Sequence, residues 1–186
     1  NKRLQKCAEE LKIPKGETIS REEGIVTVKG PKGEVKRTAN KDKVEWKIES
    51  DKITISCEKA TKREKRAINT FTAHINNMIR GVQKNFVYKL KVCSGPPQSH
   101  FPMQVNCAGG VFTVKNFLGE KIARTVKVNQ GANVKITGTD ITVESTDIEL
   151  AGKTASDIEL LVRISDKDRR TFQDGIYITQ KPGRND

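Results

Sequence analysis

Residues 27–34 read TVKGPKGE and residues 113–120 read TVKNFLGE, so one Thr-Val-Lys and Gly-Glu frame recurs 86 residues later. Further matches follow in the same order: Arg37-Thr38 with Arg124-Thr125, then Ile53-Thr54-Ile55 with Ile141-Thr142-Val143. These tripeptides are common in strands, so chance is the alternative interpretation. Two copies at this period indicate two duplicated domains, because a solenoid needs at least three short repeats.

The two halves are expected to be separate domains, residues 1–95 and 96–186, because Ser94-Gly95-Pro96-Pro97 has the composition of a linker. Residues 86–92 then form a strand that leaves the first domain. Each half contains short alternating segments of the kind that form antiparallel strands. They are residues 25–28, 34–38, 44–48 and 52–57 in the first half, and residues 103–107, 111–115, 122–128, 133–137 and 141–145 in the second. The predicted fold class is therefore α+β, with a small, mostly antiparallel sheet and one or two helices in each domain.

The strongest helix prediction covers residues 62–80, where apolar residues recur at helical spacing. Thr61 and Glu64 have the spacing of a capping box, and Gly81 is placed as the C-terminal stop. In the second half, Ser156 and Glu159 suggest a capping box for a helix over residues 157–164. Residues 166–174 are expected to form a short helical turn that ends at Gly175.

The composition favours a polyanionic partner. The chain has 186 residues, and 35 Lys and Arg against 23 Asp and Glu give a net charge of +12. Neutralised phosphates release condensed counterions, which makes nucleic acid a natural partner. A basic surface also fits membrane-surface binding or simple solubility. No apolar run approaches the roughly 18 residues of a membrane span, so no membrane partner is expected.

Basic residues gather in three places, each with a less specific alternative. The first is the start of the long helix, where free backbone N–H groups favour phosphate, although a solvated charged surface is equally plausible. The second is a loop and strand in the second half, and the third is the C-terminal region, where cations outnumber acids. The candidate RNA-binding residues are Lys62, Arg63 and Arg66 in the first group, Lys115, Asn116, Lys121, Arg124 and Lys127 in the second, and Arg163, Lys167, Arg169, Arg170, Lys181 and Arg184 in the third.

Two side chains in the second group have expected positions. Alternation along a strand places Arg124 on the same face as Val126 and Val128, so Arg124 should lie at a sheet edge or pair with an acid. Phe117 either presents its ring for base stacking or fills the core. The core is the favoured interpretation.

No residue pattern indicates catalysis, a metal or a cofactor. The two histidines are His74, inside the long helix, and His100, after the Pro-rich linker. The four cysteines, at positions 7, 57, 93 and 107, form no C-x-x-C pair and no zinc-ligand spacing. No phosphate-binding loop with Gly-Lys-Ser/Thr is present. A non-enzymatic protein with reduced thiols is therefore expected.

Several blocks together resemble one known family. They are residues 28–33 (VKGPKG), 77–82 (NMIRGV), 100–102 (HFP), 116–121 (NFLGEK) and 167–178 (KDRRTFQDGIYI), followed by Lys181. The set resembles large-subunit ribosomal protein six in its archaeal and eukaryotic form, called large-subunit protein nine in eukaryotes. The blocks span nearly the whole chain in family order. Leu160 departs from the pattern, because the family usually has Gln there, and a polar contact at that position is in doubt.

The resemblance implies two related α+β domains and a structural role in the large ribosomal subunit, in the cytoplasm. It implies binding of ribosomal RNA near the sarcin–ricin region, mainly through the C-terminal domain, with other ribosomal proteins as neighbours and the docking site of translational GTPases nearby. Two other functions remain as alternatives: a free-standing nucleic-acid-binding module, and a small cytosolic enzyme with a Cys or His nucleophile.

Overall fold

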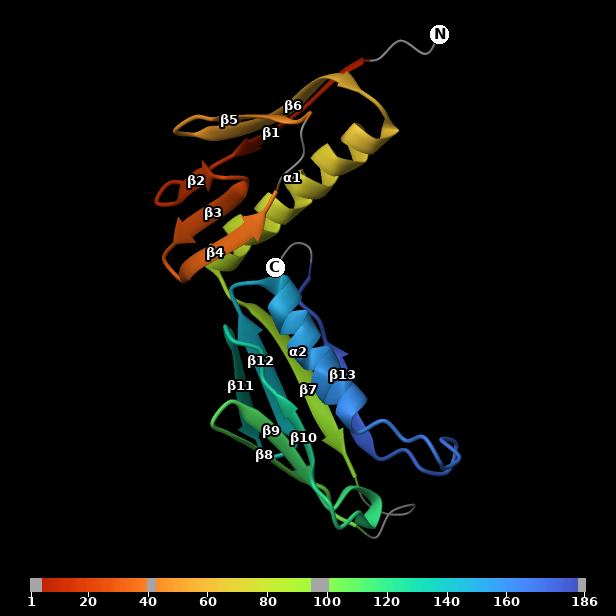
Figure 1. Cartoon of the computed structure of the whole chain (residues 1–186). Helices are drawn as coiled ribbons and strands as arrows, with labels where there is room; N and C mark the ends of the chain where they lie inside the picture. The colour runs from red at the N-terminus through yellow and green to blue at the C-terminus, as the bar shows by residue number, and fades with distance from the viewer. Residues whose placement is uncertain (1–4, 40–42, 95–100, 184–186) are drawn as a thin grey trace. The chain divides into compact units, whose positions relative to one another are not determined.

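The chain folds into two compact units, residues 1–85 and residues 86–186. The computed structural model describes residues 5–39, 43–94 and 101–183 (Figure 1). Each unit combines antiparallel strands with one α-helix, as expected for an α+β fold.

Among its described residues, the first unit contains six strands and then a helix. They are β1 (Gln5–Lys12), β2 (Thr18–Glu22), β3 (Ile25–Gly30), β4 (Gly33–Thr38), β5 (Glu45–Ile48), β6 (Lys52–Ala60) and α1 (Lys62–Gln83). The strands form two three-stranded sheets, in the orders β2-β3-β4 and β1-β6-β5. The β3–β4 hairpin pairs Val28 with Val35 across the predicted turn.

The second unit begins with a strand and ends with one. Its elements are β7 (Phe86–Cys93), β8 (Gln104–Ala108), β9 (Val111–Lys115), the 3₁₀ turn η1 (Phe117–Gly119), β10 (Arg124–Lys127), β11 (Ala132–Thr137), β12 (Asp140–Ser145), α2 (Ile148–Leu161) and β13 (Gly175–Gln180). The sheets have the orders β10-β9-β8 and β11-β12-β7-β13.

The two units share one topology, which confirms the predicted duplication. The sheet β2-β3-β4 corresponds to β8-β9-β10, and β1-β6-β5 corresponds to β7-β12-β11. In both units the helix follows the last strand of this series. Among the described residues, β13 has no counterpart in the first unit, and it extends the second sheet beyond β7.

The boundary between the units differs from the one expected at residues 95–96. Strand β7 pairs with β12 on one side and β13 on the other, so it is a central strand of the second unit. The sequence placed it in the first domain because the Gly-Pro-Pro segment follows it. The Gly-Pro-Pro segment lies between two strands of the second unit, β7 and β8, and not between the units. The pairing of β7 places the boundary between the units after Asn85.

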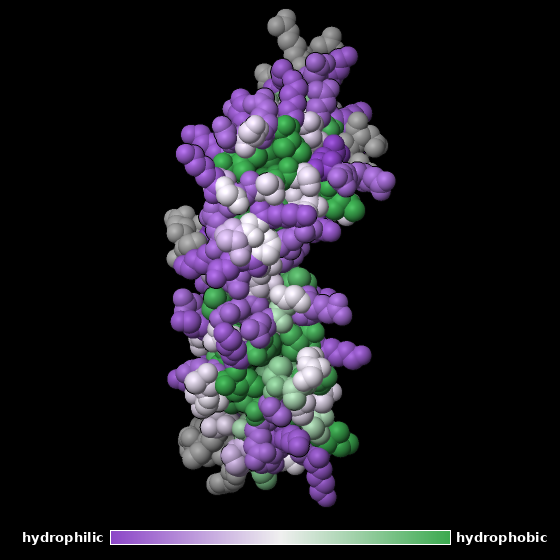
Figure 2. Space-filling model, turned by 90° about the vertical axis from the view of Figure 1, so that its left-hand side faces the viewer, coloured by the Kyte–Doolittle hydropathy of each residue, from purple (hydrophilic) through white to green (hydrophobic). Residues whose placement is uncertain are grey.

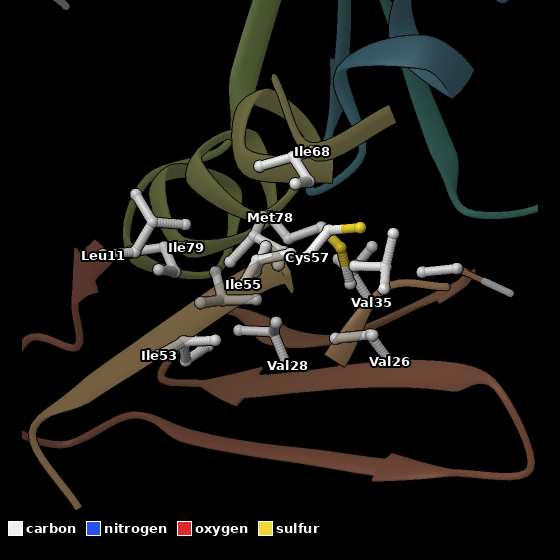
Figure 3. Close-up of a cluster of buried hydrophobic side chains, with 14 of the residues drawn as sticks. Leu11, Val26, Val28, Val35, Ile53, Ile55, Cys57, Ile68, Met78 and Ile79 are labelled. Atoms are coloured by element: carbon white, nitrogen blue, oxygen red, sulfur yellow. The ribbon is translucent and has the colours of Figure 1, made fainter. Parts of the chain in front are cut away.

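Helix α1 covers the core of the first unit, as its apolar stripe predicted. Figure 3 shows Ile68, Met78 and Ile79 of the helix facing strand residues such as Val28 and Ile55. The Thr61–Glu64 capping box is present. The stop predicted at Gly81 is wrong, because the helix continues to Gln83 and buries Val82 completely.

Helix α2 begins nine residues before its predicted start. Asp147 is its N-cap, and the carboxylate accepts a hydrogen bond of 2.9 Å from the Glu149 amide. The capping box predicted at Ser156 and Glu159 is wrong, because both residues lie inside the helix. Gly152 is also internal, and a Cβ there would lie 2.9 Å from the Tyr88 hydroxyl oxygen, so the helix approaches β7 closely at this glycine.

Three strands were not predicted. Strands β1 and β13 each pair with a strand distant in sequence. Strand β2 joins β3 through the two-residue turn Glu23-Gly24, a hairpin signal that was not recognised.

The short turn predicted within residues 166–174 is present at residues 168–172, where the Asp168 carbonyl accepts from the amides of Thr171 and Phe172. Gly175 does not close this turn but opens strand β13.

Replacement of Gly30 tests how closely the β3–β4 hairpin packs against α1. A Cβ at Gly30 would lie 2.6 Å from Val82 Cγ2, and the Lys32 amide donates to the Val82 carbonyl at 2.9 Å. Gly30→Ala should lower the free energy of unfolding of the first unit by about 1–3 kcal/mol, because the core has no room for the methyl group. Urea denaturation measures this change. Val82→Ala should partly relieve the clash, so additive losses in the double variant would contradict the proposed contact.

Candidate nucleic-acid interface

The loop between α2 and β13, residues 162–174, carries four exposed cations: Arg163, Lys167, Arg169 and Arg170. Its turn is organised by Asp168, whose Oδ1 accepts a hydrogen bond of 2.9 Å from the Arg170 amide. The Asp168 carbonyl accepts from the amides of Thr171 and Phe172 at 3.1 and 2.9 Å. The side chains of Arg163 and Arg170 have no ion-pair or hydrogen-bond partner in the described part of the chain. The loop therefore has a defined backbone and cations available to a partner.

Phe172 anchors this loop to the second unit. Its half-buried ring packs against the core, and the Lys167 ammonium lies 5.0 Å from the ring centroid. This distance is within the range of a cation–π interaction. The ring thus positions Lys167 while leaving its charge accessible.

A hollow of about 290 Å³ lies beside the loop, and Arg163 and Arg169 are among its lining residues. Leu160, at the position where the family pattern has Gln, also lines it and is exposed. The Tyr177 hydroxyl donates to the Gln173 carbonyl at 3.0 Å. Burial raises the pKa of Tyr177, and negative charge nearby adds to the shift.

Arg124 joins three parts of the second unit. Its Nε donates to Glu120 Oε2 at 2.8 Å, and its Nη1 donates to the Leu161 carbonyl at 2.9 Å and to the Arg163 carbonyl at 3.3 Å. The guanidinium also lies 4.5 Å from the centroid of the Phe117 ring. The expected pairing with an acid is confirmed. Because the donors are directed inward, Arg124 holds the end of α2 in place and is a weak candidate for direct phosphate contact.

Phe117 is 1% exposed, which confirms the expectation that it fills the core. The loop around it adopts left-handed backbone conformations, with φ of 59° at Asn116 and 49° at Leu118. Asn116 Nδ2 donates to the Pro102 carbonyl at 3.2 Å. Asn116 therefore shapes the loop, and the local pattern of the sequence did not reveal this role.

The remaining candidates of the second unit are spread over its surface. Lys115, Lys121 and Lys127 are exposed and belong to the β9–β10 region. Lys181 is exposed beyond the end of β13, so the length of a strand separates it from the loop that precedes β13. Arg184 lies outside the described residues.

Two further cations, Lys89 and Lys91, were missed by the sequence reasoning. Both are exposed on β7, where they alternate with the buried Leu90 and Val92. Lys89 pairs with Gln180, the residue before Lys181, so the end of β13 gains a cationic neighbour. The alternation of Lys with apolar residues along this strand could have indicated that both lysines are exposed on one face. Figure 2 shows hydrophilic side chains over much of the visible surface of each unit.

The start of α1 holds the first group of cations, and Lys62, Arg63 and Arg66 are exposed there. The amide of Thr61 donates to Glu64 Oε2 at 2.9 Å, and the amide of Arg63 donates to Thr61 Oγ1 at 3.2 Å. Hydrogen bonds from Thr61 lower the pKa of Glu64. The Glu64 carboxylate thus already accepts a hydrogen bond at the N-terminus of α1. A phosphate bound there would depend on the side chains of Lys62, Arg63 and Arg66.

No catalytic or metal arrangement is found in the described part of the chain. No group of three or more His, Cys, Asp or Glu side chains is placed to hold a metal ion within residues 5–39, 43–94 and 101–183. All four cysteines are free, and burial raises the pKa of Cys107, which disfavours its thiolate. His74 lies in α1, and His100 lies outside the described residues. No described helix is both long enough and apolar enough to span a membrane.

Comparison with known proteins gives consistent matches over most of the chain. The family model described as ribosomal protein L6 matches residues 13–85 and 101–175. Large ribosomal subunit protein uL6 of Haloarcula marismortui is 40% identical over 177 residues, which cover 95% of this chain and 97% of the relative. The proteins of the same name from Aeropyrum pernix and Nanoarchaeum equitans are 40% and 44% identical, over 93% and 95% of this chain and 93% and 94% of the relatives.

Arg124→Ala tests the internal role of the guanidinium. Loss of its hydrogen bonds to Glu120 and to the carbonyls at the end of α2 should lower the free energy of unfolding of the second unit by about 1–3 kcal/mol. Lys127→Ala, on the same strand but exposed, should change it by no more than about 0.5 kcal/mol. Chemical denaturation followed by circular dichroism measures both. Equal small effects would show that Arg124 is a surface cation.

The Glu120–Arg124 pair should also make stability depend on pH. The hydrogen bond from Arg124 lowers the pKa of Glu120 in the folded state. The stabilisation is therefore complete above the unfolded pKa, about 4.3, and is lost as the pH falls through the lower folded pKa. The stability difference between the wild-type chain and Arg124→Ala should shrink from pH 6 to pH 3. A difference that stays constant over this range would contradict the ion pair.

Proposed function

Because this chain belongs to the ribosomal protein L6 family, whose members are structural proteins and not enzymes, we propose that it binds ribosomal RNA as a component of the large ribosomal subunit. The single observation that carries the RNA-binding proposal is the α2–β13 loop. Its backbone is ordered by Asp168, and its cations are exposed. Such a loop contacts phosphates at fixed positions without requiring a base code.

The second unit is the proposed main RNA-binding domain. Contact is assigned first to Arg163, Lys167, Arg169 and Arg170, which share one short loop. Lys115, Lys121 and Lys127 extend the surface, and Lys89, Lys91 and Lys181 are a separate cationic group around the end of β13. Arg124 supports the loop from within. The Lys62, Arg63 and Arg66 group is secondary, because Glu64 already caps that helix end.

We place the contact near the sarcin–ricin region of the large-subunit RNA and near the docking site of translational GTPases. This location is supported by the resemblance of residues 167–178 to the family pattern. Other ribosomal proteins are the expected neighbours. Co-sedimentation with large subunits in a sucrose gradient distinguishes this function from that of a free-standing nucleic-acid-binding module.

The salt dependence of RNA binding tests which cations make contact. If about six phosphates are neutralised, log affinity should fall with log salt concentration at a slope of roughly −4 to −5. Arg169→Ala with Arg170→Ala should flatten the slope by up to about two units. Fluorescence anisotropy with an RNA fragment that spans the sarcin–ricin region measures the slope across a salt series.

Lys62→Ala with Arg63→Ala is the matched control, because it also removes two exposed cations. It should flatten the slope less than the loop variant does. The reverse order of effects would move the interface to the start of α1. Thermal melting of each variant confirms that the fold is retained, which is expected since all four side chains are exposed.

A further inference from the structure

The hollow beside β13 combines apolar walls, cations and one buried acid. Its apolar walls come from Leu160, Phe172 and the ring of Tyr177, and Arg163 and Arg169 provide the cations. Its volume of about 290 Å³ is near the lower limit of small-molecule pockets, which run from about 300 to 1,000 Å³. A hollow of this size suits one planar ring system better than a folded peptide segment.

Asp174 is the buried acid, and one of its oxygens lacks a partner. The residue is 5% exposed and lines the hollow, and its Oδ2 accepts no hydrogen bond from any described residue. The other lining acid, Glu159, already accepts from the Ile178 amide at 3.1 Å. A buried carboxylate oxygen left without a donor is costly, so a ligand that brings an N–H group would satisfy it.

We propose that this hollow receives one unpaired nucleobase with an exocyclic amino group, above all cytosine, from the RNA that the loop binds. The amino N–H donates to the Asp174 carboxylate, as carboxylates do to cytosine N4. Oδ2 itself is fully buried, so the carboxylate turns about its Cβ–Cγ bond to present an oxygen to the base. The apolar walls contact the ring faces, as in most recognition of single-stranded RNA. This inference rests on the proposed RNA-binding function and names the chemistry of one subsite within it.

The cations at the hollow favour a nucleotide over a basic side chain of a neighbouring protein. Arg163 and Arg169 line the hollow itself, and Arg170 is exposed in the same loop. These charges attract the phosphates on either side of an inserted base. An incoming Lys or Arg would meet like charges before it reached Asp174, which costs affinity.

Two labelled RNA octamers, all cytidine and all uridine, test the inference with the full chain at neutral pH. Cytosine carries an amino group at C4 where uracil carries a carbonyl oxygen, so only cytosine donates from that position. The N3–H of uracil lies between two carbonyl oxygens, which repel the Asp174 carboxylate, so uracil should bind more weakly. Fluorescence anisotropy should show roughly tenfold tighter binding of the cytidine octamer, the size expected for a hydrogen bond to a charged group. Asp174→Asn should bring the two affinities together, because an amide also donates to uracil.

Asp166→Asn is the matched control, because it removes the same charge from an exposed residue that does not line the hollow. It should keep the preference for cytidine. If Asp174→Asn does not fold, Leu160→Ala replaces it: Leu160 is 58% exposed, so its loss should weaken cytidine binding without unfolding the unit. Ile122 is an apolar residue that is 84% exposed and lies outside the hollow, so Ile122→Ala should leave cytidine binding unchanged.

The outcomes separate this subsite from the proposed function. Equal affinities for the two octamers, with the ribosomal RNA fragment still bound, would overturn the nucleobase inference alone. No binding of either octamer or of the fragment would overturn both. A further outcome is that an arginine-rich peptide displaces the cytidine octamer from the wild-type chain but not from Asp174→Asn. That result would assign the hollow to a protein neighbour and overturn the inference.

Discussion

The hydrogen bonds of Arg124 to the last turn of α2 are the constraint on which the candidate interface depends. The guanidinium connects the Glu120 carboxylate, in the β9–β10 loop, to the Leu161 and Arg163 carbonyls, where the helix ends. The cationic loop starts at this point. Its first residues are thus fixed to the sheet, and Asp168 and Phe172 order the remainder. Phosphate binding to such a loop loses little conformational entropy, because the backbone is already ordered.

The duplicated topology explains why this loop exists in only one of the two units. In the first unit α1 ends at Gln83, and β7 of the second unit begins almost at once, at Phe86. In the second unit α2 ends at Leu161, and the chain must reach the far edge of β7 to form β13, which begins at Gly175. The connection of residues 162–174 provides the cations, and together with the end of α2 and the start of β13 it lines the hollow. One scaffold therefore carries the candidate site in one copy and a simple strand connection in the other.

Local patterns in the sequence predicted the parts of the structure that depend on local physics. The TVK repeats identified β3 and β9 as equivalent strands of the two units, and the Thr61–Glu64 spacing identified the start of α1. Strand alternation predicted that Arg124 lies at a sheet edge or pairs with an acid, and the pair with Glu120 is found. Strand β7, in contrast, takes its place from partners in β12 and β13, which no local pattern indicates. The helix-end carbonyls that Arg124 binds lie 37 and 39 residues away in sequence, and the free Oδ2 of Asp174 is visible only in the folded unit.

A site-specific photocrosslink from inside the large subunit tests the central claim most directly. A photoreactive amino acid replaces Arg170 in the loop or, as a reference, Glu58 on β6 of the first unit, and the crosslinked nucleotides are mapped by reverse transcription. The account predicts that position 170 crosslinks to large-subunit RNA at a small number of adjacent nucleotides, and far more strongly than position 58. Crosslinks from position 170 to protein alone, or RNA crosslinks only from position 58, would contradict it.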